Sequence, residues 1–200
     1  ARIALDDTPL LTQARFTLGW DASEVRVRDF SATLGGGKAT GEFGICCAGP
    51  LPQLQVSGRF ALDDVSFSSL VPAPVARAIS ARVDAAAKFE GTGDSFFDAL
   101  AAMTGEGSYT FDGLSVEGFD PAAFSAIASL DEVLAMEPDA LTAAVIDQLD
   151  DSAFTVPSVS GGFTVAGGVL RSPNLAVVGE AARLFGSTNL RLADLGLSGG

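Results

Sequence analysis

The feature that most constrains the fold is the alternation of apolar and polar residues over the first 62 positions, which only short turns interrupt. Phe16, Leu18 and Trp20 alternate with polar or small residues, and the same period of two recurs in three further segments. Side chains with this period point to opposite faces of a strand, so each segment predicts a strand with one apolar face. After Asp29 the alternation slips by one residue, which predicts a bulge. Four such strands joined by short turns, one of them at residues 35–37, predict a meander.

Residues 63–150 mix helical and strand periods. Apolar residues at helical spacing predict short helices over 72–83, 95–103, 121–130 and 138–149. Asp94 or Ser95 is a candidate N-cap for the second of them. Asp112-Gly113 is a strong two-residue turn signal, so we predict a tight hairpin at that point. From residue 151 onward the period of two returns and predicts further strands.

These patterns predict one α+β, β-dominated domain over residues 1–200. Its sheet is antiparallel, meandering, curled and groove-like, with three to four short helices packed on it or capping it. Within this domain we distinguish an N-terminal β-meander (1–62), a helix and hairpin insert (63–150) and C-terminal strands (151–200). No apolar run approaches the roughly 18 residues that a transmembrane helix needs. The first residue is Ala and no signal peptide is evident, so we interpret the chain as a piece of a longer protein.

The composition argues against catalysis. The chain has no histidine, which is the commonest general base and metal ligand. Cys46 and Cys47 are adjacent and no second pair exists to complete a zinc site, so we expect one to face each side of a strand. Paired acids at turns or helix ends fit solvated loops: Asp63-Asp64, Asp131-Glu132 and Asp150-Asp151. We therefore expect no enzymatic activity, no metal and no cofactor.

The charge balance restricts the partners. Lys and Arg number 12 and Asp and Glu number 25, so the net charge is 12 − 25 = −13. A chain this acidic is repelled by phosphate backbones and anionic lipid headgroups. We expect no binding to nucleic acid and no electrostatic docking on a membrane surface.

The apolar face of the sheet has two interpretations. The helices could cover it, which would make the chain a structural or protein-interaction domain with a closed core and no bound lipid. Alternatively, part of the face stays open as an apolar trough, which would have to meet lipid or a partner. The candidate trough residues lie on the early strands that have no helix of their own: Phe16, Leu18, Trp20, Phe43, Val56 and Phe60.

Several motifs resemble, in order, the C-terminal region of the AsmA family of bacterial envelope proteins. They are GxxxGxF from Gly37, GxFxLxDVxFxxL from Gly58, a helix that follows Gly93-Asp94-Ser95, the pair Asp112-Gly113-Leu114 and Gly118-Phe119-Asp120, and the segment 154–197. The resemblance spans roughly residues 38–197. One departure is that residues 185–190 hold a single glycine where the family has a glycine-rich GxGxxDL step.

The resemblance implies a non-enzymatic periplasmic segment of an inner-membrane-anchored protein. In that family the β-rich body curls into an apolar groove that serves phospholipid transport and outer-membrane biogenesis. It therefore implies phospholipid acyl chains as partners, further contacts with envelope proteins, and a membrane anchor outside this sequence. No catalytic residue is carried over.

Overall fold

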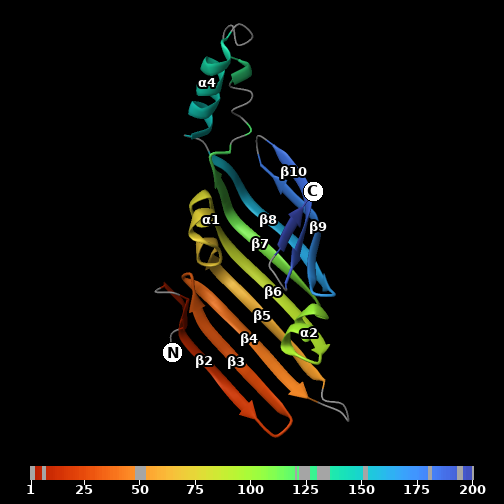
Figure 1. Cartoon of the computed structure of the whole chain (residues 1–200). Coiled ribbons are helices and arrows are strands. Elements are labelled where there is room, and N and C mark those ends of the chain that lie inside the picture. Colours follow the sequence, from red (N-terminus) through yellow and green to blue (C-terminus); the bar gives the residue numbers. More distant parts are fainter. Residues whose placement is uncertain are drawn as a thin grey trace.

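A computed structural model describes residues 3–5, 8–47, 53–119, 121, 127–129, 136–150, 153–179, 182–192 and 196–199. These residues form one eleven-stranded sheet whose strands pair in chain order (Figure 1). The strands are β1 (Ile3–Leu5), β2 (Thr8–Trp20), β3 (Glu24–Leu34), β4 (Gly37–Cys47), β5 (Leu54–Ser66), β6 (Ile79–Gly93), β7 (Thr104–Glu117), β8 (Ala153–Ala166), β9 (Val169–Val178), β10 (Arg183–Arg191) and β11 (Gly196–Gly199). The helices are η1 (Phe67–Ser69), α1 (Ala73–Ala78), α2 (Phe96–Ala101) and α4 (Pro138–Asp150).

Every neighbouring pair of strands is antiparallel, and the sheet curls without closing into a barrel. The prediction of a β-dominated, antiparallel, meandering and curled sheet is thus confirmed. A single sheet runs through all three predicted sections of the chain, because β6 and β7 of the middle section pair with β5 and β8.

Local sequence signals place the bulges and turns. The register of β3 against β4 shifts between Val27 and Phe30, and Asp29 between them has φ of 52°, which confirms the predicted bulge. Asp64 has the same φ of 52° where β5 shifts against β6. Gly35 and Gly36, with φ of 53° and 80°, make the β3–β4 turn. Bulges increase the local twist and bend of a strand, so they contribute to the curl.

The predicted hairpin at Asp112-Gly113 is wrong. β7 continues through both residues, and its neighbours pair with it on either side of the glycine. Only Gly113 has a positive φ, of 60°, whereas a type I′ hairpin turn requires two such residues. The glycine instead belongs to a bulge against β6: Asp112 pairs with Arg82 and Ser115 with Ser80, so two residues of β7 stand opposite one of β6.

The helix predictions are partly correct. The helix predicted over 72–83 ends at Ala78, and Ile79 begins β6. Ile79 and Val83 also fit a period of two, and pairing with two neighbouring strands outweighs a marginal helix of this length. Ser95 caps α2, since its hydroxyl oxygen accepts a 3.2 Å hydrogen bond from the Asp98 backbone N–H. The helix predicted over 138–149 is α4, and most of the one predicted over 121–130 lies outside the described residues.

Buried side chains gather in two clusters. One contains Leu34, Ala39 and Val65, near the β3–β4 turn. The other joins β8 to β9 through four residues: Phe154, Val156, Val159 and Val177. Between these clusters most apolar residues of the sheet are half-buried. This part of the sheet surface is therefore the candidate binding surface.

Candidate functional site

The two faces of the sheet differ sharply in chemistry. Val56, Gly58, Phe60 and Leu62 share one face of β5, because alternate side chains of a strand point the same way. We call this the inner face. The ladders extend it to Ala39, Gly41, Phe43 and Ile45 on β4, and to Ala85, Ala87, Phe89 and Gly91 on β6. The alternate positions form the outer face, where the charged residues of these strands lie: Lys38, Glu42, Arg59, Asp84, Lys88 and Glu90.

Glycines on the inner face leave room for aromatic rings to lie close to the backbone of the sheet. A Cβ atom at Gly58 would lie 2.8 Å from Cζ of Phe89 and 2.9 Å from Cδ1 of Phe43, so both rings lie across that glycine. These two rings also contact each other, with centroids 6.2 Å apart. In the same way the Phe163 ring lies across Gly107. Because these rings lie over glycines, they form an aromatic floor close to the backbone of the sheet.

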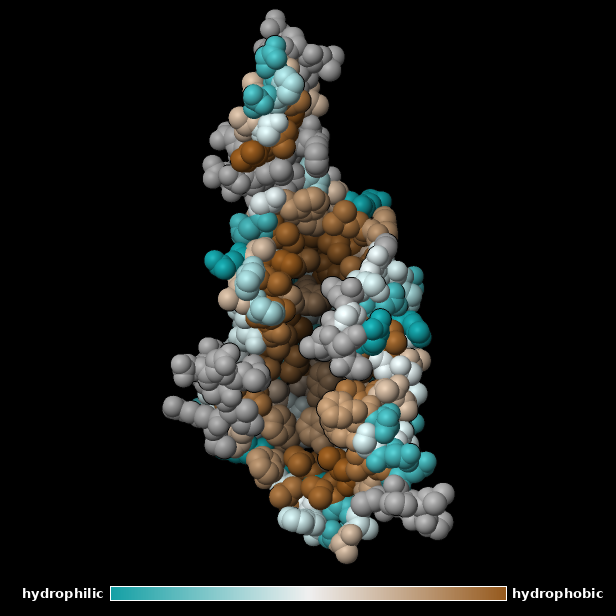
Figure 2. Space-filling view, viewed as in Figure 1, coloured by the Kyte–Doolittle hydropathy of each residue, from teal (hydrophilic) through white to brown (hydrophobic). Residues whose placement is uncertain are grey.

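A hollow lies above this floor. Figure 2 shows apolar side chains gathered in it along the length of the molecule, with hydrophilic residues at its edges. Two helical segments contact the inner face near opposite ends of β6. Ala99 of α2 is fully buried, and a Cβ atom at Gly93 would lie 2.5 Å from Cβ of Asp98. At the other end the Phe67 ring of η1 meets the Phe111 ring edge-on at 5.8 Å.

All six candidate residues predicted from the sequence lie on the inner face. Leu18 and Trp20 pair with Val27 and Val25, and Phe16 lies between outward-facing neighbours. The exposed fractions of Phe16, Leu18 and Trp20 are 53%, 54% and 80%. On the inner strands, Val56 is buried, and Phe43 and Phe60 are half-buried.

Sequence reasoning missed residues that complete the floor. The ladders place Phe60, Ala87, Gly107 and Phe163 side by side on β5, β6, β7 and β8. Alternation alone predicts which side of its own strand each residue occupies. It carries no signal for which residues of distant strands become neighbours.

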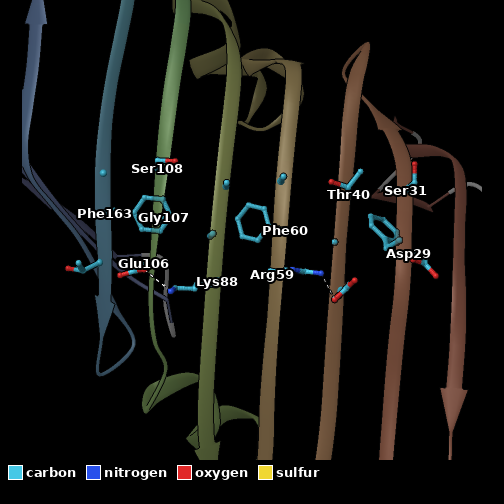
Figure 3. Close-up of a pocket in the computed structure, with 18 of the residues that line it drawn as sticks. Asp29, Ser31, Thr40, Arg59, Phe60, Lys88, Glu106, Gly107, Ser108 and Phe163 are labelled. Atoms are coloured by element: carbon cyan, nitrogen blue, oxygen red, sulfur yellow. Dashed lines mark ion pairs between the residues drawn. The ribbon is translucent and has the colours of Figure 1, made fainter.

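A cavity of about 1060 Å³ lies at the middle of strands β3–β8 (Figure 3). Small residues in register line it, and a row of longer polar side chains flanks them. The small residues are Ser31, Thr40, Ala61, Ala86, Ser108 and Gly162. Phe30, Gly41, Phe60, Ala87, Gly107 and Phe163, which lie at inner-face positions, also border it, whereas Phe43, Phe89 and Tyr109 do not.

Two ion pairs join four of the five charged residues that line this cavity, and Asp29 is the fifth. Glu42 and Arg59 lie 2.9 Å apart, and Lys88 and Glu106 lie 2.8 Å apart. The hydrogen bond from Lys88 lowers the pKa of the Glu106 carboxyl, and the bond to Glu42 raises the pKa of Arg59. Paired charges, hydroxyls and small side chains make up most of the polar wall of the cavity.

A second polar cluster fastens the β5 bulge to β6. Arg82 Nε lies 2.5 Å from Oδ1 of Asp64, and the Asp64 backbone N–H donates a 2.8 Å hydrogen bond to Asp84. The hydrogen bond from Arg82 lowers the pKa of Asp64 below its ordinary value of 3.8, and the attraction between the two charges adds to it.

This ion pair predicts a pH-dependent stability. A carboxyl group whose folded pKa is lowered contributes stability that is complete above the unfolded pKa and is lost as the pH falls through the folded pKa. Asp64→Asn should therefore unfold at lower urea concentration near neutral pH. The midpoints of variant and parent should converge as the pH falls below 3.8. A difference that stays constant over the whole pH range would contradict the assignment.

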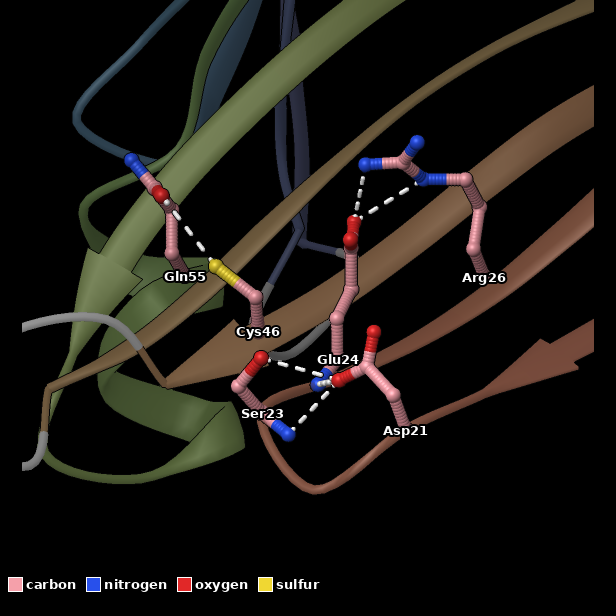
Figure 4. Close-up of polar contacts among 6 residues, drawn as sticks. All are labelled: Asp21, Ser23, Glu24, Arg26, Cys46 and Gln55. Atoms are coloured by element: carbon pink, nitrogen blue, oxygen red, sulfur yellow. Dashed lines mark hydrogen bonds and ion pairs between the residues drawn. The ribbon is translucent and has the colours of Figure 1, made fainter.

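The cysteine Cys46 lies on the outer face, and its thiol donates a 3.4 Å hydrogen bond to Oε1 of Gln55 (Figure 4). The side chain of Cys47 lies outside what the structure describes.

The β2–β3 turn is closed by Asp21, whose Oδ1 accepts 2.8 Å and 2.9 Å hydrogen bonds from the backbone N–H groups of Ser23 and Glu24.

Among the described residues, no three His, Cys, Asp or Glu side chains gather closely enough to hold a metal ion. The helices within the described ranges are all too short or too polar to span a bilayer. No protein-family model, curated protein or solved structure is similar enough to this chain to match it.

Proposed function

We propose that this chain is a non-enzymatic segment of an AsmA-like envelope protein, and that its inner face is an apolar groove for phospholipid acyl chains. The observation that carries the proposal is the uncharged inner face of β4–β6, with a glycine and aromatic floor under an open hollow. Continuity toward the β2 edge, where Trp20 is 80% exposed, supports a groove that extends to the end of the sheet.

The dimensions support an acyl chain as the ligand. Neighbouring strands are about 4.8 Å apart, so the inner face measures about 24 Å along the sheet from β3 to β8. One acyl chain spans half of a bilayer core that is about 30 Å thick. Each CH₂ group that leaves water contributes about 0.8 kcal/mol, so a chain laid on this floor would bind without any polar contact.

The cellular setting of the proposal comes from the motif resemblance. We propose a periplasmic position, with a tether to the inner membrane through a segment outside this sequence. The proposed role is phospholipid transport for outer-membrane biogenesis. The ion-paired outer face and the net charge of −13 are consistent with an outer side that stays in water.

Native mass spectrometry with lipid extraction tests the proposal on protein exported to a bacterial periplasm. We expect co-purified phospholipid, and we expect Phe60→Asp to reduce it at least about tenfold, because a carboxylate on the floor would lose its hydration without gaining a partner. Phe185→Asp is the matched control. Phe185 is 75% exposed on β10, and its neighbour Leu184 pairs with the buried Val177, so Phe185 faces the other side.

A folded parent protein without any bound lipid would overturn the proposal. It would favour the alternative, a structural or interaction domain with a covered core. Equal lipid loss in both variants would also count against a groove at Phe60, because the outer-facing control should keep its lipid.

A further inference from the structure

The seam between β8 and β9 differs from the other long ladders. β8 pairs with β7 along nearly its whole length, from Ala153 to Val165. With β9 it pairs only beside the turn, from Thr164 to Ala166. Beyond Arg171 the ladder stops, although β9 continues to Val178 and pairs with β10 along the way. Strands β9–β11 are therefore attached to the rest of the sheet at one end.

Where the ladder stops, side-chain hydrogen bonds of Ser172 join β9 to β7 and β8, and we call the Tyr109–Ser172 pair the latch. The hydroxyl of Ser172, a buried polar residue that is 4% exposed, donates a 3.1 Å hydrogen bond to the Gly162 carbonyl oxygen. Its oxygen also lies 2.9 Å from the Tyr109 hydroxyl, which then serves as the donor in that pair. Tyr109 reaches Ser172 across β8 because Gly161 has no side chain. A Cβ atom there would lie 2.5 Å from the tyrosine oxygen.

The rest of the seam is apolar. Val177 of β9 packs against Phe154, Val156 and Val159 of β8, which are 2–4% exposed. Apolar contacts of this kind are non-directional, whereas ladder hydrogen bonds fix the register and angle of two strands. The attached end is secured separately, because the Gly168 N–H donates to the Met103 carbonyl at 3.0 Å and the Leu192 N–H donates to Gly168 at 2.9 Å.

We propose that β9–β11 form a movable wall of the hollow. The wall turns about the β8–β9 turn, and the Tyr109–Ser172 latch holds it closed. Opening uncovers the inner face of β8 and admits an apolar chain from the side, so the hollow need not be loaded only from the β2 edge. The motion is a property of the fold, and only the nature of the cargo rests on the proposed function.

Hydrogen–deuterium exchange on lipid-free protein tests the wall. Tyr109→Phe keeps the ring and removes the hydroxyl. We expect amide exchange to rise about tenfold in residues 154–161 and 172–178, the factor that corresponds to the loss of one hydrogen bond, and to stay unchanged in β4–β6. Ser172→Ala removes this bond and the bond to the Gly162 carbonyl, so exchange should rise in the same two regions and by at least as much. Ser108→Ala, which deletes an exposed hydroxyl on the outer face of β7, is the control and should change neither region.

Unchanged exchange at the seam in both latch variants would overturn the proposal. A uniform rise over the whole sheet would also overturn it, because the pair would then be a general stabilising contact. The rate at which the protein takes up fluorescent phospholipid from vesicles is the second measurement, and it should increase in both latch variants. If the seam opens in the variants but the protein binds no lipid, the proposed movable wall is supported and only the proposed function is overturned.

Discussion

Replacing Ala87 by tryptophan is expected to abolish lipid binding while the sheet stays folded. Ala87 lies on the inner face of β6, between Phe60 of β5 and Gly107 of β7. The indole ring would stand on the lowest part of the floor and occupy the space that the acyl chain needs. Because the ring enters open space, we expect a stability cost below about 1 kcal/mol. Lipid extraction and urea unfolding of the same preparation measure both quantities.

Ala86→Trp is the matched control for this blockade. Ala86 is the preceding residue of β6, is exposed, and pairs with Ala61 at an outer-facing position. The same side chain is then added to the same strand on the opposite side, and bound lipid should stay at the parent level. If lipid survives in Ala87→Trp, or disappears equally from both variants, the inner face above β6 is not the binding surface.

Replacing Gly107 by alanine is expected to be the most destabilising single change in the floor. A Cβ atom at this position would overlap the Phe163 ring and the Ala86 carbonyl oxygen. The ring can move, but the carbonyl belongs to the neighbouring strand, whose ladder to β7 would have to shift. Overpacking of this kind costs about 3 kcal/mol. The midpoint of urea-induced unfolding measures the cost.

The control for this variant is Gly162→Ala. The nearest atom to a Cβ there is the Gly107 carbonyl oxygen at 3.5 Å, which is an ordinary van der Waals contact. Alanine also restricts the unfolded chain more than glycine, so the midpoint should stay the same or rise slightly. Equal losses at both positions would show that glycine content, and not the ring that crosses Gly107, determines stability here.

Many local features could be predicted from the sequence because nearby residues determine them. Period-two alternation predicts the strands and the side that each residue faces. The slip after Asp29 predicts a bulge, and Ser95 predicts a helix cap. Each of these signals acts over a few residues through side-chain direction, backbone φ or a single hydrogen bond. The six inner-face residues named from the early strands belong to this class.

Competition between local signals was decided by pairing with other strands. Residues 79–83 fit both a helix and a strand, and they became the start of β6 because β5 and β7 lie on either side. The signal at Asp112-Gly113 fitted a hairpin, and it became a bulge in β7 for the same reason. The backbone N–H and C=O groups at the edges of β5 and β7 form hydrogen bonds only if the segment between them is extended. The sequence of one segment alone does not show that such neighbours are present.

By itself, the sequence determined the alternating strands, the glycine turn at 35–37 and the separation of apolar from charged residues between two faces. Only the tertiary structure decided that Phe60, Ala87, Gly107 and Phe163 would lie side by side, and that Tyr109 would reach Ser172 across Gly161. The physical reason is that register accumulates over successive ladders. Each strand can slip along its neighbour, so contacts between residues far apart in the chain are settled only when the whole sheet forms.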